Sequence, residues 1–341
     1  MREQFGVLAL GQAGGNIGIE FEKLGYTVAY LNTSKEDLSS IKGTHKIAIP
    51  NADGAAKDRK RVLQLASEHI VDIVDKITNI LPQKYIICVF SAGGGTGSGL
   101  SIPLMTYLSQ IQKICIPVVV LPDDKLESAK SCENTWNCCA ELMSIQGLGA
   151  TFLLDNSKCD KFVINSRFAK ELDAFINLKN SSMYGNIDMA ERKQILSCSG
   201  IAVIGKLSKP KSIASEIIQS LHNGIYAEIT SKTAMYLGIS TSNRSLDINS
   251  ITTEFNSIYD VFTGISDAST IIIASGLQWP IKRIETFKNK FERTVQNINN
   301  TIIQQPPTIQ PLQSLSFSRE EFKPTAPVNP RDILLGLLGT N

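Results

Sequence analysis

The sequence has few residues of the kinds that hold metals, and its cysteines do not suggest pairs. The three histidines, His45, His69 and His222, have no other ligand at a spacing that suits a metal. The seven cysteines are odd in number and scattered, which argues against a disulfide framework. Several lie in apolar stretches such as 86–90, where a free thiol behaves as a small hydrophobic side chain. No metal site built from protein ligands is predicted, and a reducing compartment fits best.

The sequence also lacks the long apolar run that a membrane span requires. No stretch approaches the roughly 20 apolar residues needed. The N-terminus enters a strand pattern at Phe5–Leu10 without the features of a signal peptide. The net charge of +2 gives no general attraction to nucleic acid or to a membrane surface. A cytoplasmic protein without direct membrane contact is expected.

The composition is that of a globular protein in which strands alternate with helices. At 43% hydrophobic and 19% charged residues the chain is neither disordered nor fibrous, and its length allows two domains. In the first part of the chain, strands are predicted at 5–10, 27–31, 45–49, 85–90, 116–121 and 150–154, and helices at 14–25, 56–81, 98–112 and 131–146. This alternation predicts an α/β fold in which helices cover both faces of a parallel sheet, as a nucleotide-binding domain over 1–160.

The later part of the chain is predicted to contain a second, smaller domain. Residues 161–184 hold a long central helix, predicted at 162–183 from apolar residues at helical spacing. Residues 185–280 are predicted to be mixed α/β, with helices at 188–197, 211–223 and 248–262 and strands at 201–205, 233–239 and 269–275. A charged C-terminal helix is predicted at 281–304. The remaining tail, 305–341, is rich in proline and ends in a short apolar motif.

Two glycine-rich turns each follow a predicted strand and precede a predicted helix. They are Gly11–Gly18 and Ser91–Gly99. Glycine lets the backbone approach an anion closely, and the N–H groups at a helix start favour phosphate. In the second turn Thr96 and Ser98 add hydroxyl donors. A flexible linker is the alternative, and it is disfavoured because this turn lies between two buried elements.

The spacing of these glycines argues against two other nucleotide-binding folds. The first turn has the order G-x-x-G-G, whereas a dinucleotide fingerprint requires G-x-G-x-x-G. The second strand ends at Asn32–Ser34, where no acidic residue is placed to bind a ribose hydroxyl. No G-x-x-x-x-G-K-[ST] motif is present, which excludes a P-loop. An NAD-dependent oxidoreductase is therefore a disfavoured alternative.

The loop Gly93–Gly99 resembles the signature loop of the tubulin/FtsZ superfamily of GTPases, and the resemblance extends over residues 5–280. Among its members the plasmid- and phage-borne TubZ proteins are the most similar, because of the overall length, the basic run 57–61 and a long helix after the last strand. The resemblance implies a tubulin/FtsZ-like fold that binds GTP or GDP together with Mg²⁺. It implies nucleotide contacts from Gly11, Gln12, Ala13, Gly14, Asn16, Asn32, Asp53, Gly54, Ala92, Gly93, Gly94, Gly95, Thr96, Gly97 and Ser98.

The segment Gly185–Glu191 has the N-x-D-x-x-[DE] form of the loop with which that family completes the active site of the next subunit. The resemblance implies catalytic roles for Asn186, Asp188 and Glu191, which would position the attacking water. From the residues alone, two carboxylates three positions apart at a helix start can share one face and polarise water. The same spacing also matches a capping box, which is the structural alternative.

Guanine recognition is a further implication of the resemblance. Asn156 follows the predicted strand at 150–154, and Asn165 lies on the central helix. Both positions are similar to the family's base-reading asparagines, whose amides can donate to O6 and accept from a ring N–H. The structural alternative is an ordinary helix cap.

The resemblance implies a filament-forming GTPase that assembles head to tail and hydrolyses GTP at the subunit interface. Its role would be to partition plasmid or phage DNA through a DNA-bound adaptor protein, contacted by the C-terminal helix or the tail. Direct nucleic-acid binding by the tail is not expected, because its charges balance. An FtsZ-like division GTPase is the alternative, although the apolar end Ile333–Leu338 does not match the FtsZ tail.

Overall fold

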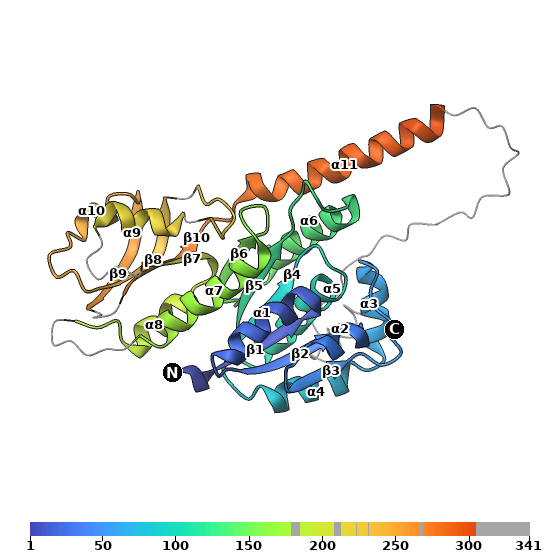
Figure 1. Cartoon of the computed structure of the whole chain (residues 1–341), viewed down its shortest axis with the longest axis horizontal. Coiled ribbons are helices and arrows are strands. Elements are labelled where there is room, and N and C mark those ends of the chain that lie inside the picture. The colour runs from blue at the N-terminus through green and yellow to red at the C-terminus, as the bar shows by residue number, and fades with distance from the viewer. Residues whose placement is uncertain (179–184, 208–212, 223, 231, 266–268, 305–341) are drawn as a thin grey trace, which may run out of the picture.

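The computed structural model describes residues 1–178, 185–207, 213–222, 224–230, 232–265 and 269–304, without the side chains of 302–304. In this part of the chain one sheet of ten strands runs in the order β3-β2-β1-β4-β5-β6-β7-β10-β8-β9 (Figure 1). The strands are β1 (Phe5–Leu10), β2 (Thr27–Asn32), β3 (His45–Ala48), β4 (Tyr85–Ser91), β5 (Ile114–Leu121), β6 (Ala150–Asp155), β7 (Gly200–Leu207), β8 (Thr233–Thr241), β9 (Ser257–Ile265) and β10 (Thr270–Leu277).

Helices lie between successive strands as far as β7; beyond it α9 and α10 are short, and the long helix α11 follows the last strand. The helices are α1 (Gly11–Lys23), α2 (Lys35–Ser40), α3 (Arg59–Ser67), α4 (Ile70–Ile80), α5 (Thr96–Gln110), α6 (Ala129–Ser144), α7 (Lys161–Ile176), α8 (Met189–Ser197), α9 (Ala214–Leu221), α10 (Asn249–Thr252) and α11 (Ile281–Gln304). A short 3-10 helix at Arg2–Gln4 precedes β1.

The first six strands form the parallel part of the sheet, as the alternation predicted. β1 lies between β2 and β4, and β5 and β6 follow in the same direction. Every residue of β1 and β6 is buried. Strands covered on both faces are mostly apolar, and β1 is accordingly an unbroken apolar run, whereas β6 also contains the buried polar residues Thr151 and Asp155.

The sheet continues through a narrow junction into a mixed part. β6 and β7 pair through Ala150 with Gly200 and through Thr151 with Ile201. Beyond β7 the strand β10 is antiparallel to both of its neighbours, and β8 and β9 are parallel. The segment after α9 returns to β6, where Tyr226 forms a bridge with Leu154.

Three sequence predictions in these regions were wrong in extent or type. Residues 56–81 form the two helices α3 and α4, and the chain leaves helical geometry at His69 between them. The central helix α7 ends at Ile176, and the predicted residues 179–183 lie outside the described part. The stretch 248–262 contains the short helix α10 and then the strand β9. Its β-branched and aromatic residues favour an edge strand, although their spacing also imitates a helix.

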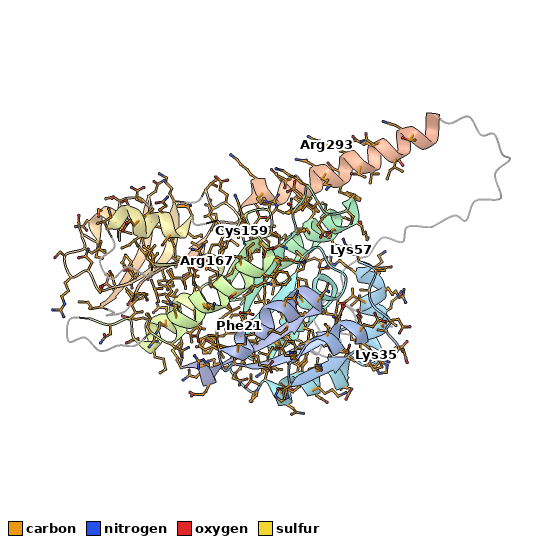
Figure 2. All side chains as sticks on the ribbon, in the orientation of Figure 1. Phe21, Lys35, Lys57, Cys159, Arg167 and Arg293 are labelled. Atoms are coloured by element: carbon orange, nitrogen blue, oxygen red, sulfur yellow. The ribbon has the colours of Figure 1, made fainter. Side chains whose placement is uncertain are left out.

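Helix α11 matches its predicted span of 281–304, and the first half of the helix packs against the hydrophobic core. Ile284 and Phe287 are 1% and 0% exposed and pack into the core. Figure 1 shows that the C-terminal half extends beyond α6, away from the rest of the molecule. Arg293, labelled midway along this helix in Figure 2, is exposed.

The cysteines behave as small hydrophobic side chains, as their apolar surroundings predicted. Five of the seven are buried and all are free thiols. Burial raises the pKa of the Cys138 thiol to about 12, so this thiol is not a reactive nucleophile at neutral pH.

Candidate nucleotide-binding site

A cavity of about 440 Å³ opens where β1, β2, β4, β5 and β6 end at their carboxyl edge. This is the edge at which ligands gather on parallel α/β sheets. Its lining consists of Leu10, Gly11, Gln12, Ala13, Asn16, Asn32, Thr33, Ser34, Asp37, Gly54, Ala55, Ala56, Lys57, Ser91, Gly93, Gly94, Gly95, Thr96, Gly97, Val120, Pro122, Glu127, Ser131, Asn156 and Lys161.

Two helix N-termini meet at this cavity. Helix α1 begins at Gly11 and α5 begins at Thr96. The two turns are in close contact, since a Cβ added to Gly11 would lie 3.2 Å from the amide nitrogen of Gly97. Gly11 also has a φ of 69°, which favours glycine. The first N–H groups of a helix have no partner within it, and the helix dipole is positive at this end, so two such ends together favour a polyanion.

The glycines of the Gly93–Gly97 turn serve different purposes. A Cβ on Gly93 would lie 2.4 Å from Oγ of Ser131, and a Cβ on Gly95 would lie 2.5 Å from Cβ of Ala55. These two glycines allow close packing of α6 and of the loop after β3. A Cβ on Gly94 meets nothing closer than 3.9 Å, so this glycine leaves room at the cavity.

A chain of side-chain hydrogen bonds joins β2 to the start of α5. The hydroxyls of Thr33 and Thr96 are 2.7 Å apart, and Thr96 Oγ1 donates to Oδ1 of Asn32 at 3.3 Å. The amide of Asn32 donates in turn to a carboxylate oxygen of Asp37 at 3.2 Å. These groups are fixed before any ligand enters, which lowers the entropic cost of binding.

The loop after β3 covers one side of the cavity. Asn51, Ala56 and Lys57 have φ values of 56°, 46° and 60°, a conformation that non-glycine residues adopt at a cost. The ammonium of Lys57 donates to Glu127 at 2.7 Å, and Asn134 donates to the carbonyl of Lys57 at 2.8 Å. The hydrogen bond from Lys57 lowers the pKa of the Glu127 carboxyl below its usual value.

The cavity lining includes most of the nucleotide contacts that the resemblance implied. Those that line it are Gly11, Gln12, Ala13, Asn16, Asn32, Gly54, Gly93, Gly94, Gly95, Thr96, Gly97 and Asn156. Five others are not part of the lining: Gly14, Asp53, Ala92, Ser98 and Asn165. A Cβ on Gly14 would lie 2.4 Å from the carbonyl oxygen of Val89, so this glycine allows α1 to pack on β4. The hydroxyl of Ser98 donates to the carbonyl of Gly94, within its own turn.

The lining also contains residues that sequence reasoning did not select. Lys57 reaches the cavity from the loop after β3, Glu127 from the loop after β5, and Lys161 from the start of α7, and Asp37 and Ser131 add polar groups. A basic residue directly after the loop at 50–56 was the available signal for Lys57. Nothing in the sequence around Glu127 marks it as close to Lys57, because 70 residues separate the two.

The end of the cavity beside β6 contains an amide with unused hydrogen-bonding capacity. Asn156 follows β6 directly, and its backbone N–H donates to Leu121 at 3.1 Å. Its Oδ1 atom is buried and accepts no hydrogen bond from the described residues. A buried acceptor without a partner is costly, so a donor group of a bound ligand would stabilise this position.

The acidic pair lies elsewhere in the same protomer, and the predicted capping box is present. Asp188 Oδ1 accepts from the backbone N–H of Glu191 at 2.9 Å, and Glu191 Oε2 accepts from the N–H of Asp188 at 2.8 Å. Next to this turn, Sδ of Met189 accepts from Gln4, which immediately precedes β1. The pair therefore lies at the amino edge of the sheet, opposite the cavity, with Asp188 and Asn186 exposed to solvent.

The turn that carries this pair is firmly anchored. Ile187 is 1% exposed. The guanidinium of Arg192 donates to the carbonyl of Ile176 at 2.8 Å and to that of Asp188 at 3.1 Å. The carbonyl of Gly185 accepts from the N–H of Ile265 at 3.0 Å. These contacts hold the carboxylates in a fixed place relative to α7 and β9.

A larger cavity, of about 680 Å³, lies beside α9, β7 and β10. Its walls are mainly apolar and include Val203, Leu221 and Leu277. The cavity of about 440 Å³ at the carboxyl edge of the parallel strands is the better nucleotide site, because helix N-termini, hydroxyl groups and lysines meet there. Among the described residues no cluster of three or more side chains could hold a metal by itself, and no helix is long and apolar enough to cross a membrane.

Comparison with known proteins decides the family. Residues 4–163 match the GTPase domain of the Tubulin/FtsZ family. The tubulin-like protein TubZ of Clostridium botulinum C phage is 30% identical over 291 residues, which are 82% of this chain and 80% of that protein. The chain belongs to the TubZ branch of the tubulin/FtsZ family. It is accordingly a tubulin-like GTPase that binds GTP and GDP, and the oxidoreductase alternative is set aside.

Solved TubZ structures have the same fold as this family member. The crystal structure of TubZ from Clostridium botulinum phage c-st superposes with a TM-score of 0.78 and 27% identity, over 87% of this chain and all of that one. A protofilament of Bacillus thuringiensis serovar israelensis TubZ in its GTPγS form gives a TM-score of 0.72 at 17% identity, over 89% and 94% of the two chains. The expected tubulin/FtsZ-like fold is therefore confirmed.

Two glycine substitutions should separate packing from binding in this TubZ-family cavity. Gly14→Ala forces a methyl group against the backbone of β4, and we expect a loss of stability of about 1–3 kcal/mol. Gly94→Ala meets no close neighbour, so its melting temperature should stay near that of the wild type. Its GTP affinity should fall by about tenfold or more, roughly 1.4 kcal/mol. Thermal unfolding and nucleotide titration measure the two effects, and wild-type GTP binding by Gly94→Ala would contradict the assignment.

Proposed function

We propose that this GTPase assembles head to tail into filaments, hydrolyses GTP at the contact between protomers, and moves plasmid or phage DNA through an adaptor. The observation that carries the proposal is the separation of two groups across one sheet. The cavity lies at the carboxyl edge of the parallel strands, and Asp188 and Glu191 lie at the amino edge. A further support is that the Bacillus thuringiensis TubZ structure is a protofilament.

Head-to-tail stacking would bring the two groups together. β1 has six residues, so the two edges of the sheet are separated by roughly 20 Å along the strands. A translation along the strand direction would set the amino edge of one protomer over the carboxyl edge of the next. Such a contact uses different surfaces on the two partners, and without a closing rotation it continues into an open filament.

In this proposal the cavity binds the nucleotide and the incoming pair activates water. The helix starts at Gly11 and Thr96 hold the phosphates, and Asn156 reads the base with its unpaired Oδ1 atom. Asp188 and Glu191 of the neighbour orient the attacking water and accept its proton. Phosphoryl transfer then depends on positioning and charge, which is why assembly would be required.

Mg²⁺ fits the donor set of the cavity. Mg²⁺ prefers oxygen ligands and is commonly held by substrate phosphates with one or two protein groups. The hydroxyls of Thr33 and Thr96 and the carboxylate of Asp37 line the cavity close to one another. When bound, the ion would neutralise charge on the phosphates. The chain's own contribution is to hold these oxygens in place.

We assign one role to each predicted domain. Residues 1–160 would bind the nucleotide, the central helix at 161–184 would connect to the activation domain at 185–280, and helix 281–304 or the tail 305–341 would contact a DNA-bound adaptor. The tail lies outside the described residues. Direct contact with a membrane or with nucleic acid is not part of the proposal.

Conservative substitutions can separate capping from catalysis at the acidic pair. Glu191→Gln keeps an oxygen for the N–H of Asp188 but removes the negative charge. We expect its melting temperature to stay near the wild-type value, its filaments to persist, and its turnover to fall by on the order of 100-fold or more. Phosphate release and GTP-dependent pelleting are the measurements.

Asp188→Asn and Glu191→Ala complete this series. Asp188→Asn still caps the helix and should slow hydrolysis, whereas Glu191→Ala also removes a capping hydrogen bond and should lose about 0.5–2 kcal/mol of stability. Wild-type phosphate release by both Glu191 variants, with normal pelleting, would show that this carboxylate is not catalytic.

Hydrolysis that needs two protomers should depend on protein concentration. At dilutions where the chain is monomeric, turnover per subunit should be close to zero, and it should rise steeply once pelleting shows filaments. The measurement is phosphate release over a dilution series at constant GTP. A turnover per subunit that stays constant across the series would indicate a site complete within one protomer.

A further inference from the structure

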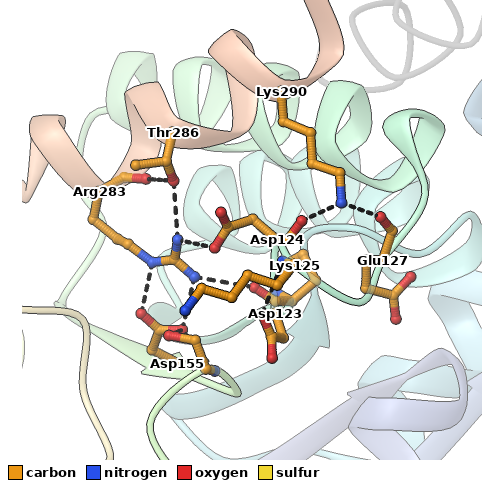
Figure 3. A network of polar contacts seen from close by, with 10 residues as sticks. Asp123, Asp124, Lys125, Glu127, Asp155, Arg283, Thr286 and Lys290 are labelled. Atoms are coloured by element: carbon orange, nitrogen blue, oxygen red, sulfur yellow. Dashed lines mark hydrogen bonds and ion pairs between the residues drawn. The ribbon is translucent and has the colours of Figure 1, made fainter. Parts of the chain in front are cut away.

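One arginine outside the cavity connects helix α11 to two of the cavity's walls. Arg283 is only 14% exposed, and all five of its N–H donors are used. Its guanidinium binds both carboxylate oxygens of Asp155, at 2.7 and 3.0 Å, and the carbonyl of Pro122 at 3.2 Å. The remaining donors go to Asp124 and Thr286 (Figure 3).

The partner Asp155 is the last residue of β6 and is fully buried. It has no exposed surface. Its Oδ1 also accepts from the N–H and the hydroxyl of Ser157, at 3.0 and 2.8 Å. These bonds bend the chain around Asn156, the residue between them. A buried carboxylate needs a cation to offset its desolvation, and Arg283 is that cation.

The same guanidinium also binds the chain that follows β5. Pro122 follows β5 and lines the cavity, and Asp124 comes two residues later. The N–H of Asn156 donates to the last residue of β5, Leu121. The ends of β5 and β6 are thus tied to each other at the backbone. Arg283 binds both ends, through the carbonyl of Pro122 and the carboxylate of Asp155. Between them lies the unpaired Oδ1 of Asn156.

Lys290, two turns further along α11, holds the loop that leads from β5 to α6. Its ammonium donates to the carbonyl oxygens of Asp124 and Glu127 (Figure 3). Glu127 lines the cavity and accepts from Lys57. Although no residue of α11 lines the cavity, this helix fixes the residues that form its wall.

We propose that Arg283 is a positioning residue for base recognition: by holding Asp155 and Pro122 it sets the orientation of Asn156 in the nucleotide cavity. This inference rests on the proposed base-reading role of Asn156. The apolar contacts of Ile284 and Phe287 keep α11 docked, so the loss of Arg283 changes the cavity wall without releasing the helix. Arg283 would therefore affect which base is bound more than how the phosphates are bound.

The test compares Arg283→Gln with the wild type, as full-length protein below the concentration of assembly. The probes are GDP, ADP and tripolyphosphate, titrated calorimetrically. We expect the preference for GDP over ADP to fall by at least about tenfold, because the amide that reads the base loses its orientation. Tripolyphosphate affinity should be unchanged, since the helix N-termini that bind it are untouched.

Three further variants control for folding and charge. Arg293→Gln removes the same charge from an exposed position of the same helix and should behave as wild type. Arg283→Lys keeps a cation for Asp155 and should recover part of the preference. The double variant Asp155→Asn/Arg283→Gln replaces the buried ion pair by neutral groups. If Arg283→Gln alone does not fold, the same titrations are made with this double variant.

The possible results distinguish this inference from the proposed function. If Arg283→Gln and the double variant both prefer GDP over ADP as strongly as the wild type does, the positioning role of Arg283 is wrong, and the proposed function is unaffected. Equal losses of GDP and tripolyphosphate affinity would also overturn the positioning role, because they indicate a general structural effect. A wild-type chain without any preference for GDP would contradict the proposed function as well.

Discussion

The meeting of two helix N-termini at one edge of the sheet is the constraint on which the rest of the structure depends. Unpaired N–H groups and helix dipoles of the same sign cannot be placed side by side without an anion or water to satisfy them. Gly11 and Gly97 allow the approach, and the surrounding loops are arranged so that the space between the helices stays open. The strained loop at 51–57, the hydroxyls of β2 and α5, and the wall held by α11 all surround this one cavity.

The acidic turn at the opposite edge has two possible uses that do not exclude each other. In the monomer Asp188 and Glu191 cap α8, and each uses one carboxylate oxygen for this. A carboxylate has further lone pairs, so capping also fixes the orientation that the remaining oxygens would present to a neighbour. Stability of the turn and a role in a shared site are therefore compatible, and only a substitution that keeps the cap can tell them apart.

The parts of the fold that could be predicted are those with strong local signals. A buried parallel strand or a glycine-rich turn is recognised from a few consecutive residues, so β1, β4 and the cavity edge could be predicted. β9 was mistaken for a helix because apolar residues at 251, 255, 258 and 262 follow helical spacing, while its pairing with β8 decides its structure. Gly14 and Ser98 stay predicted phosphate contacts, and the structure adds roles that the sequence does not show: Gly14 leaves no room for a Cβ against β4, and the Ser98 hydroxyl donates to the carbonyl of Gly94. Arg283 could not have been found, because 128 residues separate it from Asp155.

The claim that one protomer completes the site of the next is tested most directly by mixing two inactive variants. Glu191→Gln binds GTP but lacks the carboxylate, and Gly94→Val supplies Glu191 but has a blocked cavity. Labelled proteins and pelleting would establish that the two co-assemble. A site shared between protomers predicts that the mixture hydrolyses GTP well above the sum of its parts. At every contact where the cavity belongs to Glu191→Gln and the acidic turn belongs to Gly94→Val, both halves are intact. Co-assembled filaments with no more hydrolysis than the separate proteins would contradict a shared site.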